Sequence, residues 1–313
     1  MIETYRPSGL FSPLAFLLAA IGAVAMVALG WVYQLSLHWI PLIYLNALAV
    51  VGFGMAGGWV AGAIVRAGRV RSPMLAIAIA CVAMAPGVAA SHYFAFQRWF
   101  DDGVNELATQ HGLSPDEMRE LITDVGFWDY VENRLEYGWT IGKVGTSNQS
   151  KPSISGPFVY GVWAIEALLA LAFAIAMART AARKPFCELT QRWADQPTVL
   201  LVRHDVPAQA IEQLGQAVRT EDLVRLPPAE PAVALPEGAS APPVAVHWSI
   251  DRPRGDDGTP FLSITRHWIA LDKQGKAQPQ QAAIWQHVPL EPAQLQAIEA
   301  ACAAFSASKA TPA

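Results

Sequence analysis

Four stretches of this 313-residue chain are long enough and apolar enough to cross a bilayer as helices. They cover residues 13–33, 41–65, 73–96 and 157–178. A hydrocarbon core of about 30 Å needs about 20 apolar residues of helix, and the first three stretches contain no Asp, Glu, Lys or Arg. They predict a polytopic α-helical membrane protein with four transmembrane helices. A cleaved signal peptide at the first stretch is the minor alternative, because such peptides have a shorter apolar run of about 7–15 residues.

Charged residues are almost absent from the first third of the chain and gather in its last third. Of the 22 Lys and Arg and 26 Asp and Glu, five fall in residues 1–97 and 27 in residues 179–313. This distribution excludes a single soluble domain and a disordered chain. The net charge of −4 gives no reason to expect nucleic acid as a partner. The expected partners are the lipid bilayer and either other proteins or further copies of the chain.

Lysine and arginine near the spans predict which way they face, because cytoplasmic loops carry an excess of these bases. Three arginines lie between the second and third spans, and three bases follow the fourth, whereas residues 98–156 carry ten acids against five bases. We therefore expect a bacterial inner-membrane protein with both termini in the cytoplasm and residues 98–156 in the periplasm. The six bases are Arg66, Arg69, Arg71, Arg179, Arg183 and Lys184.

The domains follow from this division. Residues 1–97 hold an N-terminal segment and three spans, and 98–156 predict a periplasmic helical segment, with a serine-capped helix starting at Ser114-Pro115-Asp116-Glu117. After the span at 157–178, residues 179–313 predict a cytoplasmic α+β domain. In it we expect strands at 198–202, 244–250, 261–271 and 281–287, a turn at 272–275, helices at 207–218 and 291–304, and a Pro-rich linker at 227–243.

Glu166 is the one acid within the four spans. It lies about 13 Å into the fourth span at 1.5 Å per residue, where an ionised carboxylate costs several kcal/mol and such residues are often functional. At similar depth the second span has Asn46 and the third has Ser91 and His92. One interpretation is a proton or cation relay formed by Glu166 and His92. The other interpretation, which we favour, is a structural role: a neutral, hydrogen-bonded Glu166 that fixes the helix register.

The second span carries Gly54, Gly58 and Gly62, each four residues apart. Small residues at this spacing let two helix backbones approach closely in lipid. We expect them to pack against the first or fourth span of the same chain, with a contact between copies of the chain as the alternative.

The C-terminal segment also contains four histidines and several aspartates, residue types that can bind a metal or act in catalysis. A metal or hydrolase site needs three of them to converge, and neither their spacing nor any phosphate-loop, nucleophile-elbow or zinc motif predicts this. We expect no catalytic residue, no cofactor and no metal site, and the three cysteines suggest no disulfide framework. The residues in question are His204-Asp205, His247, Asp251, His267 and His287.

Four short motifs resemble a family of uncharacterised four-span bacterial inner-membrane proteins with an N-terminal Tyr-x-Pro-Ser-Gly motif. They are Tyr5-Arg-Pro-Ser-Gly9, Pro41-Leu-Ile-Tyr-Leu-Asn46, Gly52-Phe-Gly54 and Trp163-Ala-Ile-Glu166. The resemblance implies the four-span architecture and supplies no activity. It also implies a cysteine pair near Pro185-Phe-Cys187, but the second position here is Thr190.

Together these patterns predict a non-enzymatic inner-membrane scaffold, sensor or subunit of a membrane assembly. The alternative is a proton- or cation-coupled transporter or channel component that uses Glu166. Four spans without an evident internal repeat favour the first prediction.

Overall fold

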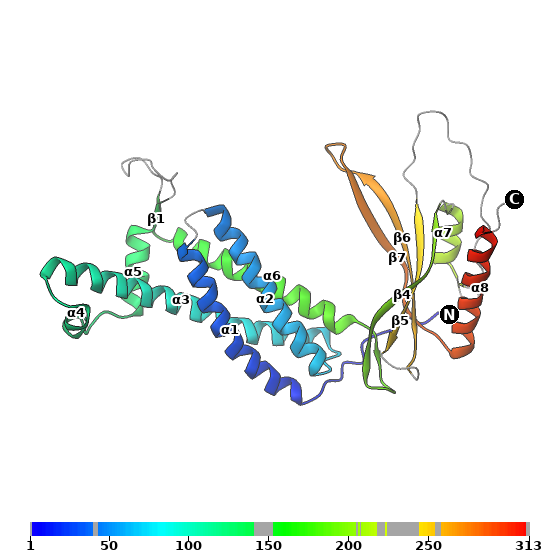
Figure 1. Cartoon of the computed structure of the whole chain (residues 1–313), viewed down its shortest axis with the longest axis horizontal. Helices are drawn as coiled ribbons and strands as arrows, with labels where there is room; N and C mark the ends of the chain where they lie inside the picture. The colour runs from blue at the N-terminus through cyan, green and yellow to red at the C-terminus, as the bar shows by residue number, and fades with distance from the viewer. Residues whose placement is uncertain are drawn as a thin grey trace. The chain divides into compact units, whose positions relative to one another are not determined.

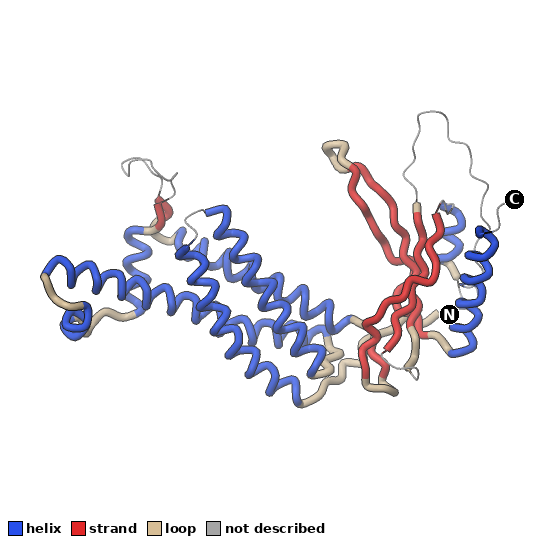
Figure 2. The backbone as a smooth tube through the Cα atoms, in the orientation of Figure 1, coloured by secondary structure: helices blue, strands red, loops and turns tan. Residues whose placement is uncertain are grey.

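A computed structural model describes residues 2–39, 43–140, 153–204, 206, 208–217, 223, 244–253 and 258–310. The chain forms two compact units: a helical unit, Ser8–Arg183, and a sheet unit that combines Met1–Pro7 with Lys184–Ala313. The long helices belong to the first unit, and the five-stranded sheet with two further helices belongs to the second (Figures 1 and 2). The predicted linker at 227–243 lies outside the described residues.

Four helices of the first unit are long and apolar enough to cross a membrane. They are α1 (Leu14–Trp39), α2 (Ile43–Ala67), α3 (Pro73–His111) and α6 (Phe158–Arg183). The four apolar stretches predicted from the sequence are thus confirmed as helices.

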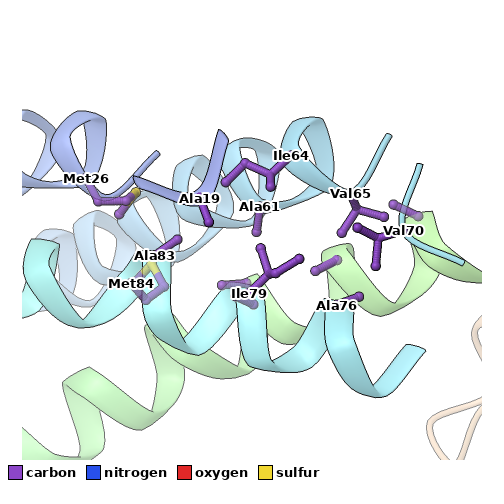
Figure 3. Packing of buried hydrophobic residues seen from close by; sticks show 14 of the residues in the cluster. Ala19, Met26, Ala61, Ile64, Val65, Val70, Ala76, Ile79, Ala83 and Met84 are labelled. Carbon is purple, nitrogen blue, oxygen red and sulfur yellow. The ribbon is translucent and has the colours of Figure 1, made fainter. Parts of the chain in front are cut away.

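The helical unit has small residues inside and large apolar residues outside. More than half of the buried residues in its core are alanine, and Figure 3 shows Ala61, Ala76 and Ala83 among the residues that fill the space between α1, α2 and α3. This is the packing expected in lipid, where small residues let helices approach and the outer surface needs no polar cover. Apolar side chains that are more than half exposed include Val24, Trp59, Val82 and Leu168.

Helix α3 does not end at residue 96, where the predicted span ends, but continues to His111. The prediction ended the span here because the apolar run stops. A helix can nevertheless continue beyond its apolar run with polar side chains that face water. After it come α4 (Pro115–Leu121), α5 (Phe127–Tyr137) and a small pair of strands, β1 (Trp139–Thr140) and β2 (Ser153–Ile154). The helix start at Ser114 is confirmed: its hydroxyl accepts from the Glu117 N–H, and the Glu117 carboxylate accepts from the Ser114 N–H.

The glycines of α2 lie against α6. A Cβ added at Gly54 would lie 2.8 Å from Ala170 Cα, and one at Gly58 would lie 2.5 Å from Met177 Sδ. Gly62 is less closely packed, because the nearest atom to its added Cβ is 4.0 Å away. The stripe therefore packs the second span against the fourth within one chain.

The sheet unit contains a five-stranded antiparallel sheet with the strand order β3-β4-β5-β6-β7. Its helices are α7 (Ala208–Gly215) and α8 (Pro292–Ala310), which lie on one face of the sheet (Figure 1). The strands are β3 (Phe186–Cys187), β4 (Arg192–His204), β5 (Ala245–Pro253), β6 (Phe261–Leu271) and β7 (Ala277–Pro289).

The predicted strands and helices of this unit are present, but several are longer. The predicted strand 198–202 is part of the 13-residue β4, in which Val199 and Val202 are exposed. The predicted strand 281–287 begins four residues earlier, because β6 and β7 continue as a hairpin beyond the end of β5. The turn at 272–275 is confirmed, with Asp272 Oδ1 accepting from two backbone N–H groups.

The first residues of the chain belong to the sheet unit. Ile2 packs against its core, and the Tyr5 N–H donates to the His287 carbonyl at 2.9 Å. The Tyr5 ring meets Phe261 edge to face, with 5.6 Å between ring centroids. The two ends of the chain therefore fold together, although some 180 residues of helical unit separate them.

The glycine packing predicts unequal effects of one substitution at two positions of α2. Gly54→Ala should destabilise the helical unit by about 1–3 kcal/mol, because the new methyl group overlaps the α6 backbone. Gly52→Ala is the matched control, since nothing lies within 4 Å of its added Cβ. Thermal unfolding of the full chain in detergent measures both, and equal melting temperatures would contradict the packing described.

Candidate functional site

We call the face of the sheet opposite α7 and α8 the outer face. Val246, Trp248 and Ile250 of β5 are buried in the core shared with the two helices. Because successive strand residues point to opposite faces, the residues between them lie on the outer face, together with their partners on β6. The outer face thus carries Ala245, His247, Ser249 and Asp251 of β5 and Phe261, Ser263, Thr265 and His267 of β6.

At one end of the outer face, Asp251 meets His287 of β7. The His287 Nε2 atom lies 3.5 Å from Asp251 Oδ2. Ser263 joins them, because its hydroxyl is hydrogen-bonded to the Asp251 carboxylate and accepts from the His287 backbone N–H at 3.2 Å. His287 has φ +53, a left-handed conformation that is uncommon outside glycine, and it lies where the pairing of β6 and β7 is irregular.

The N-terminal segment helps to bury this cluster. Tyr5 crosses it, with its backbone bound to His287 and its ring against Phe261. The side chains of Asp251 and His287 are accordingly only 14% and 22% exposed. The sequence did not single out Tyr5 or Ser263 for this site, although strand alternation along 261–271 already places Ser263 with the polar residues.

Burial sets the protonation of the cluster. It raises the pKa of Asp251, an effect that the Lys184 ammonium and the Ser263 hydrogen bond partly oppose. Burial lowers the pKa of His287, and the charge of Lys184 lowers it further. Both shifts favour the neutral forms, because each group loses hydration when the unit folds.

At the other end of the outer face, His247 stacks on His267. Their ring centroids are 3.9 Å apart and their planes are inclined by 26°. The structure thus brings two pairs of these residues together, His247 with His267 and Asp251 with His287, which spacing in the sequence did not predict. They lie 20 and 36 residues apart in sequence, and only the pairing of β5, β6 and β7 brings them together.

The arrangement at Asp251 is not that of a serine hydrolase. In such enzymes the imidazole lies between the hydroxyl and the carboxylate, so that it can take the hydroxyl proton. Here the carboxylate lies between Ser263 and the His287 ring. Among the side chains that the structure describes, no three His, Cys, Asp or Glu groups converge on a common point.

The polar residues of the predicted spans do not form a relay in the described part of the chain. The His92 ring packs edge to face on Trp163, with 5.0 Å between centroids, and no hydrogen bond or ion pair joins it to Glu166 among the described residues. The Tyr33 hydroxyl and Asn46 Oδ1 are buried without a hydrogen-bond partner among the described residues.

The remaining predicted positions, the glycines of α2 and the cysteines, lie in packed parts of the fold or near them. Gly54, Gly58 and Gly62 lie in the α2–α6 contact described above. None of the three cysteines forms a disulfide with another described residue. Cys187 is buried, with its sulfur 4.0 Å from Thr259 Oγ1.

No protein-family model, curated protein or solved structure matches this chain.

The buried histidine predicts a pH dependence of the sheet unit. The pKa of His287 is lowered in the folded state from its ordinary value of 6.5. The unfolded chain therefore binds a proton on this imidazole more tightly than the folded chain does. Stability from this group is present above that pH and is lost as the pH falls towards the folded pKa. As the pH falls from about 7.5 to about 5.5, hydrogen exchange of peptides from β5 to β7 should therefore accelerate more in the wild-type chain than in the His287→Asn chain.

Asparagine is the chosen replacement because it tolerates the left-handed backbone and does not titrate. Comparison at each pH removes the intrinsic pH dependence of exchange. A difference between the two chains that stays constant across this range would show that His287 does not titrate differently on folding.

Proposed function

We propose that this protein is a bacterial inner-membrane scaffold, sensor or assembly subunit, with four membrane-spanning helices and both termini in the cytoplasm. The observation that carries the proposal is the outer face of the sheet, on which polar side chains of β5 and β6 lie beside the exposed Val199 and Val202 of β4. This face belongs to the sheet unit, which contains none of the four long apolar helices. The periplasmic part is the end of α3 with α4 and α5. The motif resemblance agrees with this architecture.

Two further features support the proposal. The helical unit has the inverted packing of a lipid-embedded bundle, small inside and apolar outside. The bases Arg66, Arg69 and Arg71 lie at the end where α1 begins, because the Gly9 N–H donates to the Arg71 carbonyl and the Ser12 N–H to that of Gly68. Such a concentration of arginine is typical of the cytoplasmic side.

The orientation predicts where reporters become active. Since Ile2 and Tyr5 pack in the same unit as the C-terminal sheet, reporters fused before Met1 and after Ala313 should both report the cytoplasm. A reporter inserted after Leu121 should report the periplasm. Termini on opposite sides, or a periplasmic C-terminus, would contradict the proposal.

A scaffold that uses the outer face should lose its partner when that face gains a charge. We expect Thr265→Lys to release a protein that copurifies with the wild-type chain in detergent. Gln296→Lys is the matched control, because it adds the same charge to an exposed position of α8, behind the other face. Partner retention by both variants would contradict a role for the outer face.

The alternative function is a proton- or cation-coupled transporter or channel component. It is favoured by Glu166, which makes no hydrogen bond to a described residue, and by the Tyr33 hydroxyl, which is buried without a hydrogen-bond partner among the described residues. Glu166→Gln separates the two, because the amide keeps the shape but cannot carry a proton. Under the scaffold proposal the purified chain moves no protons in vesicles and the variant assembles normally; pH-dependent flux that Glu166→Gln abolishes would establish the alternative.

A further inference from the structure

We propose that a pocket between α1 and α3 binds the headgroup of a phospholipid of the phosphoethanolamine class, with Arg98 on the phosphate and Asp102 on the ammonium group. The proposal rests on the membrane-spanning helices of the proposed function and is independent of the scaffold role. It concerns polar residues to which the sequence pattern gave no function.

The pocket lies where the last turns of α1 run beside the second half of α3 (Figure 1). It follows the close contact of the two helices by one turn, since a Cβ added at Gly30 would lie 3.2 Å from the Ser91 backbone nitrogen. Its volume is about 250 Å³, which is below the roughly 300–1,000 Å³ of pockets for drug-sized ligands and suits a headgroup. The polar residues that line it are Gln34 of α1 and Gln97, Arg98, Asp101 and Asp102 of α3.

Helix length places the pocket at the height of lipid headgroups. Helices α1 and α3 begin at the same end of the unit, because the Ser12 N–H donates to the Gly68 carbonyl. At 1.5 Å per residue, Gln34 lies about 30 Å along α1 and Arg98 about 38 Å along α3. A hydrocarbon core of about 30 Å becomes about 40–45 Å thick with its headgroup layers. The pocket therefore adjoins the headgroups of the leaflet away from the loop between α2 and α3.

Two opposite charges of the pocket are available to a ligand. No ion pair joins Arg98 or Asp102 to another side chain that the structure describes, whereas the neighbouring Asp101 is paired with Arg119 of α4 at 2.6 Å. Asp102 follows Arg98 by four residues, so the two lie on the same face of α3, about 5–6 Å apart at their Cβ atoms. A phosphate and an ammonium group joined by two carbons can bridge such a pair.

The apolar part of the lining favours a lipid over a free phosphate ester. Trp31 and Phe94 line the pocket about one turn nearer to the hydrocarbon core than Gln34 and Arg98 do. Trp31 is 51% exposed, and tryptophan is enriched at membrane interfaces. The pocket is thus apolar towards the core and charged towards water, as a phospholipid is.

The two charged groups select among phospholipids. A guanidinium group binds phosphate oxygens through charge-assisted hydrogen bonds, and all phospholipids offer these oxygens. A carboxylate accepts hydrogen bonds from the primary ammonium of phosphatidylethanolamine. Phosphatidylcholine has no N–H group, and phosphatidylglycerol has no cation, so neither can satisfy Asp102 in this way.

The test is native mass spectrometry of the full-length chain in detergent, with each of these three lipids added in turn and with identical acyl chains. Phosphatidylethanolamine should bind most tightly. Arg98→Gln should weaken its binding by about 10-fold, because a hydrogen bond to a charged group is worth at least that factor. Asp102→Asn should weaken phosphatidylethanolamine similarly and leave phosphatidylglycerol bound as before. Glu106→Gln is the matched control, since it removes an exposed acid one turn further along α3 that does not line the pocket.

Two further measurements separate the possible failures. Glycerophosphoethanolamine has the headgroup without acyl chains and should bind at least about 10-fold more weakly than the lipid, because it buries no apolar chain; equal affinity would overturn a lipid ligand in favour of a soluble ester. Flotation with vesicles tests the spans, since a chain that does not float contradicts the membrane architecture itself. For a chain that floats, equal binding of the three lipids, or equal behaviour of Asp102→Asn and Glu106→Gln, overturns the headgroup site alone.

Discussion

The close approach of α2 and α6 is the constraint on which the helical unit depends. Lipid offers no hydrophobic reason for two apolar helices to associate, so contact must come from backbones that can approach closely. At Gly54 the α6 backbone lies where any side chain would stand. Gly30 of α1 likewise lies against the Gly87 carbonyl of α3. A Cβ added at Gly87 would lie 2.8 Å from the Met26 carbonyl oxygen of α1, which explains why α3 has a glycine directly after Pro86, within an unbroken helix.

The sheet unit depends on a different interaction, the return of the N-terminal segment to a sheet made from the C-terminal residues. Tyr5 adds a backbone hydrogen bond to β7 and a ring contact to β6. These contacts help to remove Asp251 and His287 from water, and the resulting desolvation dominates the pKa shifts of both groups. The outer face is therefore divided into a covered end, at Asp251, and a more open end, at the stacked histidines.

The four long helices could be predicted from the sequence because twenty consecutive apolar residues have few alternative structures. The strand at 261–271 and the turn at Asp272 follow from equally local signals. Register could not be predicted, since it is set by pairing between distant segments: nothing in the spacing of His247 and His267 indicates that their rings stack. The docking of Tyr5 on β6 and β7 is non-local in the same way. The sequence indicated that Glu166 is unusual and offered His92 as its partner. Only the structure shows that the His92 ring contacts Trp163.

The length of α3 has a mechanical consequence. Its 39 residues span about 58 Å at 1.5 Å per residue, almost twice the hydrocarbon thickness of about 30 Å. The distal part is braced by an ion pair between Arg119 of α4 and Asp101 and by the packing of Met118 on Val104 and Ala108. About half of the helix therefore lies beyond the length that a hydrocarbon core needs. This projecting half is what holds α4 in place, so the two contacts fix where the following segment begins.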